Sequence, residues 1–195
     1  MGRPREFEMD EALDAAIGVF WERGYQGASM TDLVAATGLQ KGSLYKAFED
    51  KHDLFMKSLA RYLEGGLSEL DRALRGAVSP KAGLKSWLGA MVVERSCTGG
   101  RRVGCFAVNS VVELGLADET VHRQLEAHFA RMRRKLGDTI HKGQGQGELR
   151  DDLSAEALSD FVISIASGLL ALSKGQISKR QGKGVVELAL AAISP

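Results

Sequence analysis

The fold of this 195-residue chain is set by residues 31–48, which read TDLVAATGLQKGSLYKAF. Residues 29–32 have the pattern of a capped helix start, and the short helix that follows is predicted to end at Gly38. A three-residue turn comes next, and a second short helix is predicted from Lys41 to Phe48. Two short helices joined by such a turn are the layout of a helix-turn-helix.

The second of these helices has the surface that a DNA groove requires. The major groove is about 12 Å wide, so a helix that enters it needs a lean, polar outer face. Leu44, Ala47 and Phe48 can turn inward to hold the helix, and Gly42 permits close approach of the backbone. The residues of the predicted outer face are Lys41, Gly42, Ser43, Tyr45 and Lys46.

Further residues are candidates for DNA contacts beside this helix. Thr31 and Lys51 lie at the starts of two other helices, where free N–H groups suit phosphates. Arg3 and Arg5 form a basic start that is either a disordered tail or an arm along the minor groove. Tyr45 has two readings as well, a phosphate contact or a core residue.

Helical patterns continue on both sides of this unit. Before it, apolar residues from Leu13 to Trp21 repeat at helical spacing, and Gly24 closes the helix. After it, Asp50 caps a long helix that is predicted to end at Gly76. A further helix is predicted to start at Ser79-Pro80, because Pro suits the first helical position. Other helices are predicted at about 104–114, from Asp118 to the glycines at 143–147, at about 154–174 and at about 182–193, with a polar loop at 98–102.

This pattern predicts an all-α fold of about nine helices, because no stretch alternates as a strand does. The predicted division is an N-terminal three-helix domain with the helix-turn-helix at residues 1–55 and a C-terminal helical domain for ligand binding and dimerisation at residues 56–195. Residues 153–170 and 185–193 are small or apolar nearly all round, which favours a second buried surface. A homodimer through these last two helices, including Leu188 and Leu190, is expected; the alternative is that they complete the core of the monomer.

Composition indicates the cellular compartment of the protein. It does not indicate DNA binding, which depends on where the charged residues lie. The net charge is +1, and acidic residues outnumber basic ones in the first fifty positions, so whole-chain charge does not indicate a nucleic-acid binder. No apolar run reaches the roughly 18 residues of a membrane span, and the first residues lack a signal peptide. A cytoplasmic protein without a membrane partner is expected, with its two cysteines, Cys97 and Cys105, as free thiols.

The chain resembles the TetR family of bacterial regulators. The resemblance lies in residues 31–48, in Lys51 and the pair Leu54-Phe55 after them, and in the preceding stretch 20–25. The resemblance implies an N-terminal DNA-binding domain, a C-terminal effector and dimerisation domain, and repression relieved by a ligand. It also implies that Lys41, Ser43, Tyr45 and Lys46 meet DNA and that Thr31 and Lys51 touch phosphates. The family often has an aromatic residue or His where this chain has Lys46, so whether Lys46 reads a base or a phosphate stays open.

Cys105 is a candidate sensor. It is predicted to start a helix after Arg101 and Arg102, and both features lower a thiol pKa. The sequence around it also loosely resembles a TetR subgroup with Gly-Cys at this point, in which some members sense electrophiles. The alternative is a small packing residue, which is what a free Cys usually is.

A small-molecule effector is expected in an apolar cavity of the C-terminal domain. Aromatic surfaces with one amide are typical of such cavities, although the same rings are equally typical of an ordinary core. The predicted lining consists of Trp87, Met91, Phe106, Asn109 and Phe129, with Cys105 at its border.

Other classes of function have weaker support. His122 and His128 are six residues apart, which does not place both on one helix face for a metal, and no nucleotide or hydrolase motif occurs. We therefore expect no catalytic residues, no metal and no cofactor. The rival readings are an enzyme with Cys105 as nucleophile, which lacks an evident base, and an architectural helical bundle. The expected partners are a palindromic operator DNA, a second copy of the chain and an unidentified small molecule.

Overall fold

The computed structural model describes residues 5–93, 97–98 and 101–195. Within these residues the chain forms nine helices and one pair of two-residue strands, which confirms the predicted all-α class. The helices are α1 (Arg5–Gly27), α2 (Met30–Thr37), α3 (Lys41–Ala47), α4 (Lys51–Arg75), α5 (Pro80–Val93), α6 (Phe106–Leu114), α7 (Glu119–Gly145), α8 (Ala155–Leu172) and α9 (Lys179–Ala192). The strands, β1 (Cys97–Thr98) and β2 (Arg101–Arg102), pair antiparallel where only a loop was predicted.

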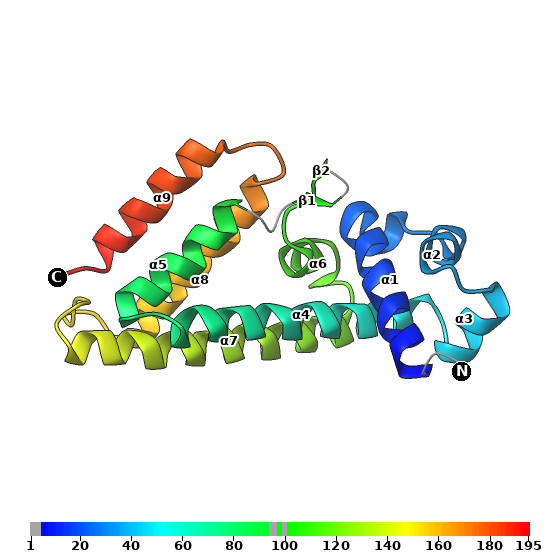
Figure 1. The fold of residues 1–195 in the computed structure, drawn as a ribbon, viewed down its shortest axis with the longest axis horizontal. Coiled ribbons are helices and arrows are strands. Elements are labelled where there is room, and N and C mark those ends of the chain that lie inside the picture. Colours follow the sequence, from blue (N-terminus) through cyan, green and yellow to red (C-terminus); the bar gives the residue numbers. More distant parts are fainter. Residues whose placement is uncertain (1–4, 94–96, 99–100) are drawn as a thin grey trace.

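The helices form an elongated molecule. Helices α4 and α7 run side by side along its length, with α1 to α3 at one end and α5, α8 and α9 toward the other (Figure 1). Helix α4 is continuous across residue 55, and the predicted division of the chain into two domains there stays a prediction.

Side-chain caps explain where the helices begin. Ser29, Asp50, Asp118, Ser154 and Ser178 each accept a hydrogen bond from a backbone N–H in the first turn of the helix that follows. The cap at Ser178 starts the last helix three residues earlier than the predicted residue 182. The helix that was predicted to break at residues 143–147 continues into this stretch, because α7 ends at Gly145.

Glycines in the left-handed region end or bend the first two helices. Gly24 has φ 74° and ψ 175°, so α1 kinks at the residue where it was predicted to end and then adds a short final turn. Gly38, with φ 67°, caps α2 and opens the turn to α3.

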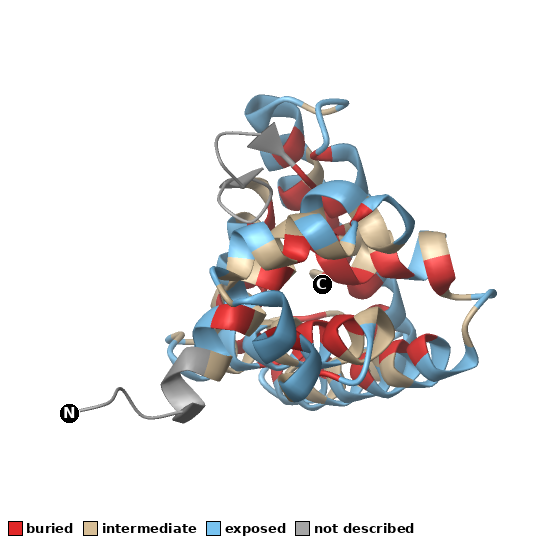
Figure 2. Cartoon of the chain, turned by 90° about the vertical axis from the view of Figure 1, so that its right-hand side faces the viewer, coloured by how far each residue is buried: buried red, intermediate tan, exposed pale blue. Residues whose placement is uncertain are grey.

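A shared apolar core holds α1 to α3 on the first turns of α4. Leu33, Leu44 and Leu54 are fully buried, and the ring of Phe20 meets that of Phe55 edge-on with centroids 5.1 Å apart. Burying each such side chain stabilises the fold by about 1.5–3 kcal/mol. Buried segments lie on the inside of this end of the molecule and exposed segments around it (Figure 2).

Helix α8 is the one helix in the described part of the chain that is long and apolar enough to cross a bilayer. A core helix of a globular domain meets the same criteria. Here Leu158, Val162, Ile163 and Ala166 of α8 are buried in the apolar core, and α8 packs closely along α7.

Candidate nucleic-acid interface

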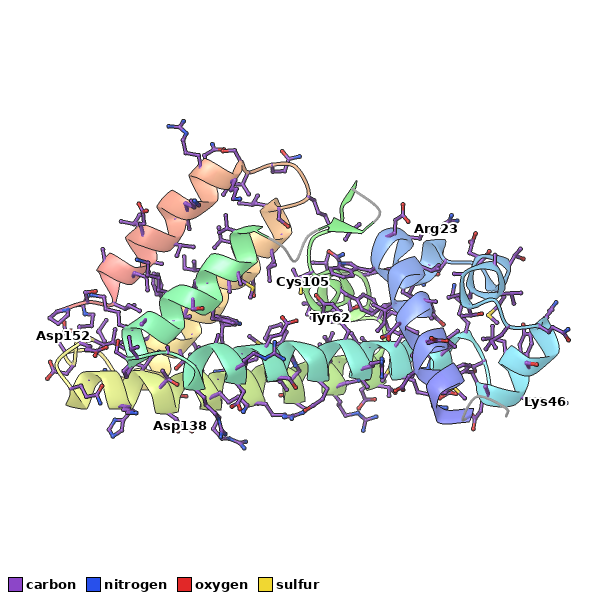
Figure 3. All side chains as sticks on the ribbon, in the orientation of Figure 1. Arg23, Lys46, Tyr62, Cys105, Asp138 and Asp152 are labelled. Carbon is purple, nitrogen blue, oxygen red and sulfur yellow. The ribbon has the colours of Figure 1, made fainter. Side chains whose placement is uncertain are left out.

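Helix α3 presents a polar face at the end of the molecule farthest from α9 (Figure 1). Leu44 and Phe48 are buried and Ala47 is half-buried, so three residues fix the inner side of this helix as predicted. The residues that lie on the exposed side are Lys41, Gly42, Ser43, Tyr45 and Lys46. Figure 3 shows Lys46 at this extremity of the chain.

The exposure of Tyr45 decides between its two readings. Its side chain is 45% exposed, which excludes the core role and leaves the ring available on the face of α3. Lys41 and Lys46 form no ion pair with any other residue that the structure describes. Their charges are therefore available to an anionic partner.

Gly42 is exposed and has open space around it. A Cβ built at this residue meets no other atom within 4 Å, and its backbone has ordinary helical geometry. The fold therefore does not require glycine here.

The two predicted phosphate residues lie beside α3, at the starts of α2 and α4. Thr31 is exposed and is the second residue of α2, because Ser29 places the helix start at Met30. Lys51 is the first residue of α4, and its Nζ lies 4.5 Å from the ring centroid of Tyr25, a cation–π contact that orients the side chain. Of the basic start, Arg3 lies outside the described residues and Arg5 is the first residue of α1.

The first two helices are tied together at their surface. Arg23 of α1 pairs with Asp32 of α2 at 2.8 Å. Hydrogen bonds from Ser29 lower the pKa of Asp32, with the charge of Arg23 adding to the effect. The capping box of α2 and this ion pair therefore share one carboxylate.

Helix α6 connects this unit to the rest of the molecule. The carboxylate of Glu113 accepts hydrogen bonds from the backbone N–H groups of Tyr25 and Gln26, at 3.0 and 2.8 Å. Next to α6, the Nε2 of His52 lies 2.7 Å from Asp118 Oδ2, so the first turn of α4 contacts the cap of α7.

A second candidate site is a cavity of about 50 Å³ between α4, α5, α6, α7 and α8. Of the residues predicted for the effector, Trp87, Met91, Cys105 and Phe129 line it. The other lining residues, which the sequence reasoning missed, are Tyr62, Leu63, Gly66, Ala107, Val108, His128, Met132, Ile163, Ala166, Ser167 and Leu170. They come from four helices, α4, α6, α7 and α8, and no local pattern marks them as one wall.

Two residues predicted for the cavity do not line it. Phe106 is buried against Phe55 and Tyr62, with centroids 5.6 and 5.5 Å apart. Asn109 uses its side-chain amide to donate to the carbonyl of Val103 at 3.0 Å. Both residues stabilise the start of α6, and neither faces the cavity.

Cys105 occupies the N-cap position of α6, as predicted from its place in the sequence. Its side chain is buried, and Sγ accepts a hydrogen bond from the Tyr62 hydroxyl at 3.5 Å. Figure 3 shows these two residues next to each other between α6 and α4. Arg101 and Arg102 belong to β2, and their side chains are outside the described part.

An open groove of about 930 Å³ lies between α1 and α4. Asp14, Arg61 and Glu64 give it a charged rim. Tyr62 and Gly66 line both this groove and the closed cavity.

Two family models match the chain. The model described as bacterial regulatory proteins, tetR family, matches residues 12–56, and the Tetracyclin repressor-like C-terminal domain matches residues 81–183. The chain belongs to the TetR family. The predicted resemblance is confirmed, and it now covers both halves of the molecule.

Individual relatives agree with this assignment. The HTH-type transcriptional repressor ComR of Escherichia coli is 29% identical over 190 residues, which are 96% of this chain and 86% of ComR. The uncharacterized regulator YezE of Bacillus subtilis is 31% identical over 83% of this chain and 84% of its own length. A cysteine mutant of the TetR-family regulator CifR, solved with 26-bp operator DNA, has a TM-score of 0.84 and 33% identity, and covers 98% of this chain and 100% of that one.

The family consists of transcriptional regulators, which gives no support to the reading as an enzyme. Among the described residues, no group of three or more His, Cys, Asp or Glu side chains is arranged to hold a metal.

Substitution of Gly42 by alanine separates DNA contact from folding. Because a Cβ at residue 42 meets no protein atom and alanine favours helix, we expect unchanged or slightly raised thermal stability. The added methyl group lies on the exposed side of α3 that is predicted to contact DNA, so operator affinity should fall by about tenfold, a loss of about 1.4 kcal/mol. Calorimetric melting and fluorescence anisotropy with operator DNA measure the two effects. Unchanged affinity would remove Gly42 from the interface.

Proposed function

We propose that this chain is a cytoplasmic transcriptional repressor that binds a palindromic operator as a homodimer and leaves it when an effector enters or modifies the cavity beside Cys105. The observation that carries the DNA-binding part is the exposed, polar face of α3, with Lys41 and Lys46 free of described ion pairs. The name of ComR as a repressor supports the direction of regulation. The CifR complex with operator DNA supports binding to DNA.

The proposed dimer interface is an exposed, partly apolar surface on α8 and α9. Phe161 and Leu172 of α8 are 36% and 47% exposed, and Leu188 of α9 is 71% exposed. Small residues continue the same exposed side, and a Cβ at Gly168 or Gly184 meets no atom of this chain. Exposure of an apolar surface to water is unfavourable. A second copy of the chain that covers this surface removes it from water.

One residue predicted for the dimer contact belongs elsewhere. Leu190 is only 7% exposed and is part of the protomer core, so charge at this residue would unfold the protomer. Leu188 is on the opposite side of α9 and stays a candidate. The pattern of apolar residues all round the helix did not distinguish these two sides.

The proposed route from the cavity to DNA runs along α6. The first turn of this helix touches the cavity through Cys105 and Ala107, and Gly104 just before it accepts a hydrogen bond from Trp21 of α1 at 3.2 Å. The last turn contacts α1 through Glu113. An effector that displaces α6 therefore moves α1, and a ligand acts only through its different affinity for the two positions.

Charged substitutions at exposed leucine and phenylalanine test the dimer. Leu188→Glu and Phe161→Glu should sediment at the monomer mass of 21.0 kDa, whereas the unmodified chain should sediment at twice that mass. The reason is that an unpaired carboxylate is costly to bury between two copies. Leu116→Glu is the matched control, because Leu116 is fully exposed between α6 and α7. A dimer that persists in both α8 and α9 variants would place the interface elsewhere.

Alkylation tests the thiol. The thiol of Cys105 adds across the carbon–carbon double bond of N-ethylmaleimide, with sulfur on one carbon and hydrogen on the other. The adduct is larger than the cavity of about 50 Å³, so the walls of the cavity must move. We expect operator affinity to fall between about 5-fold and 150-fold, the usual range of allosteric coupling. Cys105→Ser should keep its affinity after treatment, and Cys97→Ser should still lose it. Full modification of Cys105 by mass spectrometry with unchanged affinity would end the thiol proposal and leave a non-covalent effector.

A further inference from the structure

The open groove between α1 and α4 has an apolar stripe along α1 that ends in a carboxylate. Asp14, Ile17 and Trp21 line the groove, and their spacing of three and four residues places them on one face of the helix. Ile17 and Trp21 are half-buried, whereas Asp14 is exposed. The rise from Asp14 to Trp21 is about 10 Å along the helix axis. One ligand can therefore reach both the apolar surface and the charge.

The charge at the Asp14 end of the groove is negative. The guanidinium of Arg61 pairs with Asp14 at 2.6 Å and with Asp10 at 2.9 Å, so two carboxylates share one positive charge. Glu64, which also lines the groove, pairs with Arg131 at 2.8 Å. Arg61 is the one basic side chain among the described residues that line the groove. A cation is therefore favoured over an anion.

The α4 side of the groove leaves room for a ligand. Gly65 and Gly66 line the groove in the middle of this helix, and a Cβ built at Gly65 meets no side chain or other segment within 4 Å. Tyr62 lies one turn earlier, with its ring edge-on to that of Trp21 and centroids 5.1 Å apart. The groove volume of about 930 Å³ is within the range of about 300–1,000 Å³ that small-molecule sites have.

We infer that this groove binds an arylalkylammonium ion, whose ammonium group pairs with Asp14 and whose aromatic ring packs against Ile17 and Trp21. Contact between two aromatic rings is favourable beyond the area that it buries. A short carbon chain between ring and ammonium group lies along the stripe of α1. The groove is a different volume from the cavity beside Cys105, so this inference goes beyond the proposed effector cavity and does not depend on it.

The probe is 4-phenylbutylamine, which is protonated at neutral pH as the lysine side chain is. The chain has two tryptophans, so proton–nitrogen NMR of the native protein gives two indole resonances. We expect the resonance of Trp21 to shift in a saturable manner. The resonance of Trp87, which is buried and does not line the groove, should stay constant. A shift of Trp87 alone, or no shift of Trp21 up to the solubility limit of the probe, would overturn the inference.

A neutral analogue tests the role of the charge. The alcohol 4-phenylbutanol has the same ring and chain, and it should bind about fivefold more weakly than the amine, the upper range for one exposed ion pair. The carboxylate 4-phenylbutyrate should bind more weakly than the alcohol, because the groove repels an anion. Equal affinity of the amine and the alcohol would contradict pairing with a carboxylate.

Removal of one carboxylate tests the partner of the ammonium group. Asp14→Asn should weaken binding of the amine by about fivefold and leave binding of the alcohol unchanged. Arg61 keeps its pair with Asp10 in this variant. Asp138→Asn is the matched control, because Asp138 is exposed on α7 and does not line the groove, and it should bind the amine as the native chain does. Native affinity of Asp14→Asn for the amine would overturn the inference.

Gly65→Leu tests the place of the site without weakening the fold. Leucine favours helix over glycine, so the melting temperature should stay constant or rise. The added side chain occupies the open space at residue 65, so the amine and the alcohol should both bind about tenfold more weakly. Gly145→Leu, at the last residue of α7 and in equally open surroundings, is the control that should keep native affinity. Native affinity of a folded Gly65→Leu protein would place the ligand elsewhere and overturn the inference.

Discussion

The carboxylate of Glu113 on α6 links the kinked end of α1 to the C-terminal helices. It accepts from the N–H groups of Tyr25 and Gln26, which become available because α1 kinks at Gly24. A Cβ at Gly24 would lie 2.7 Å from Glu113 Oε2, so glycine is needed both for its positive φ and for the space. One α6 side chain and one glycine therefore fix how the end of α1 meets α6, in addition to the apolar core that α1 to α3 share with α4.

This attachment matters because two recognition helices must reach successive major grooves, about 34–36 Å apart, on one face of DNA. The frame between α3 and the exposed side of α8 and α9 must then be stiff. Ion pairs from Arg131 to Glu64 and from Lys135 to Asp71 link α7 to α4, at 2.8 and 2.6 Å. Such surface pairs are individually weak, and buried leucines along both helices supply most of the stiffness.

Sequence patterns predicted those features of the structure that depend on interactions between residues close in sequence. The turn after Gly38, the polar side of α3 and the cap at Asp50 depend on neighbours in sequence, and the structure confirms them. The cavity wall depends on how distant helices pack, so the sequence did not show that His128 lines the cavity or that Asn109 bonds to Val103 instead. The same limit applies to α9, where only packing against α5 buries Leu190 and leaves Leu188 outside.

Selection of binding sites by the native protein from a pool of random DNA tests the central claim most directly. A homodimer that positions two α3 helices should enrich an inverted repeat whose half-site centres lie about one helical turn, or a multiple of it, apart. Enriched sites without inverted symmetry would contradict the dimeric arrangement. No enrichment over the starting pool at physiological salt would contradict sequence-specific recognition by α3.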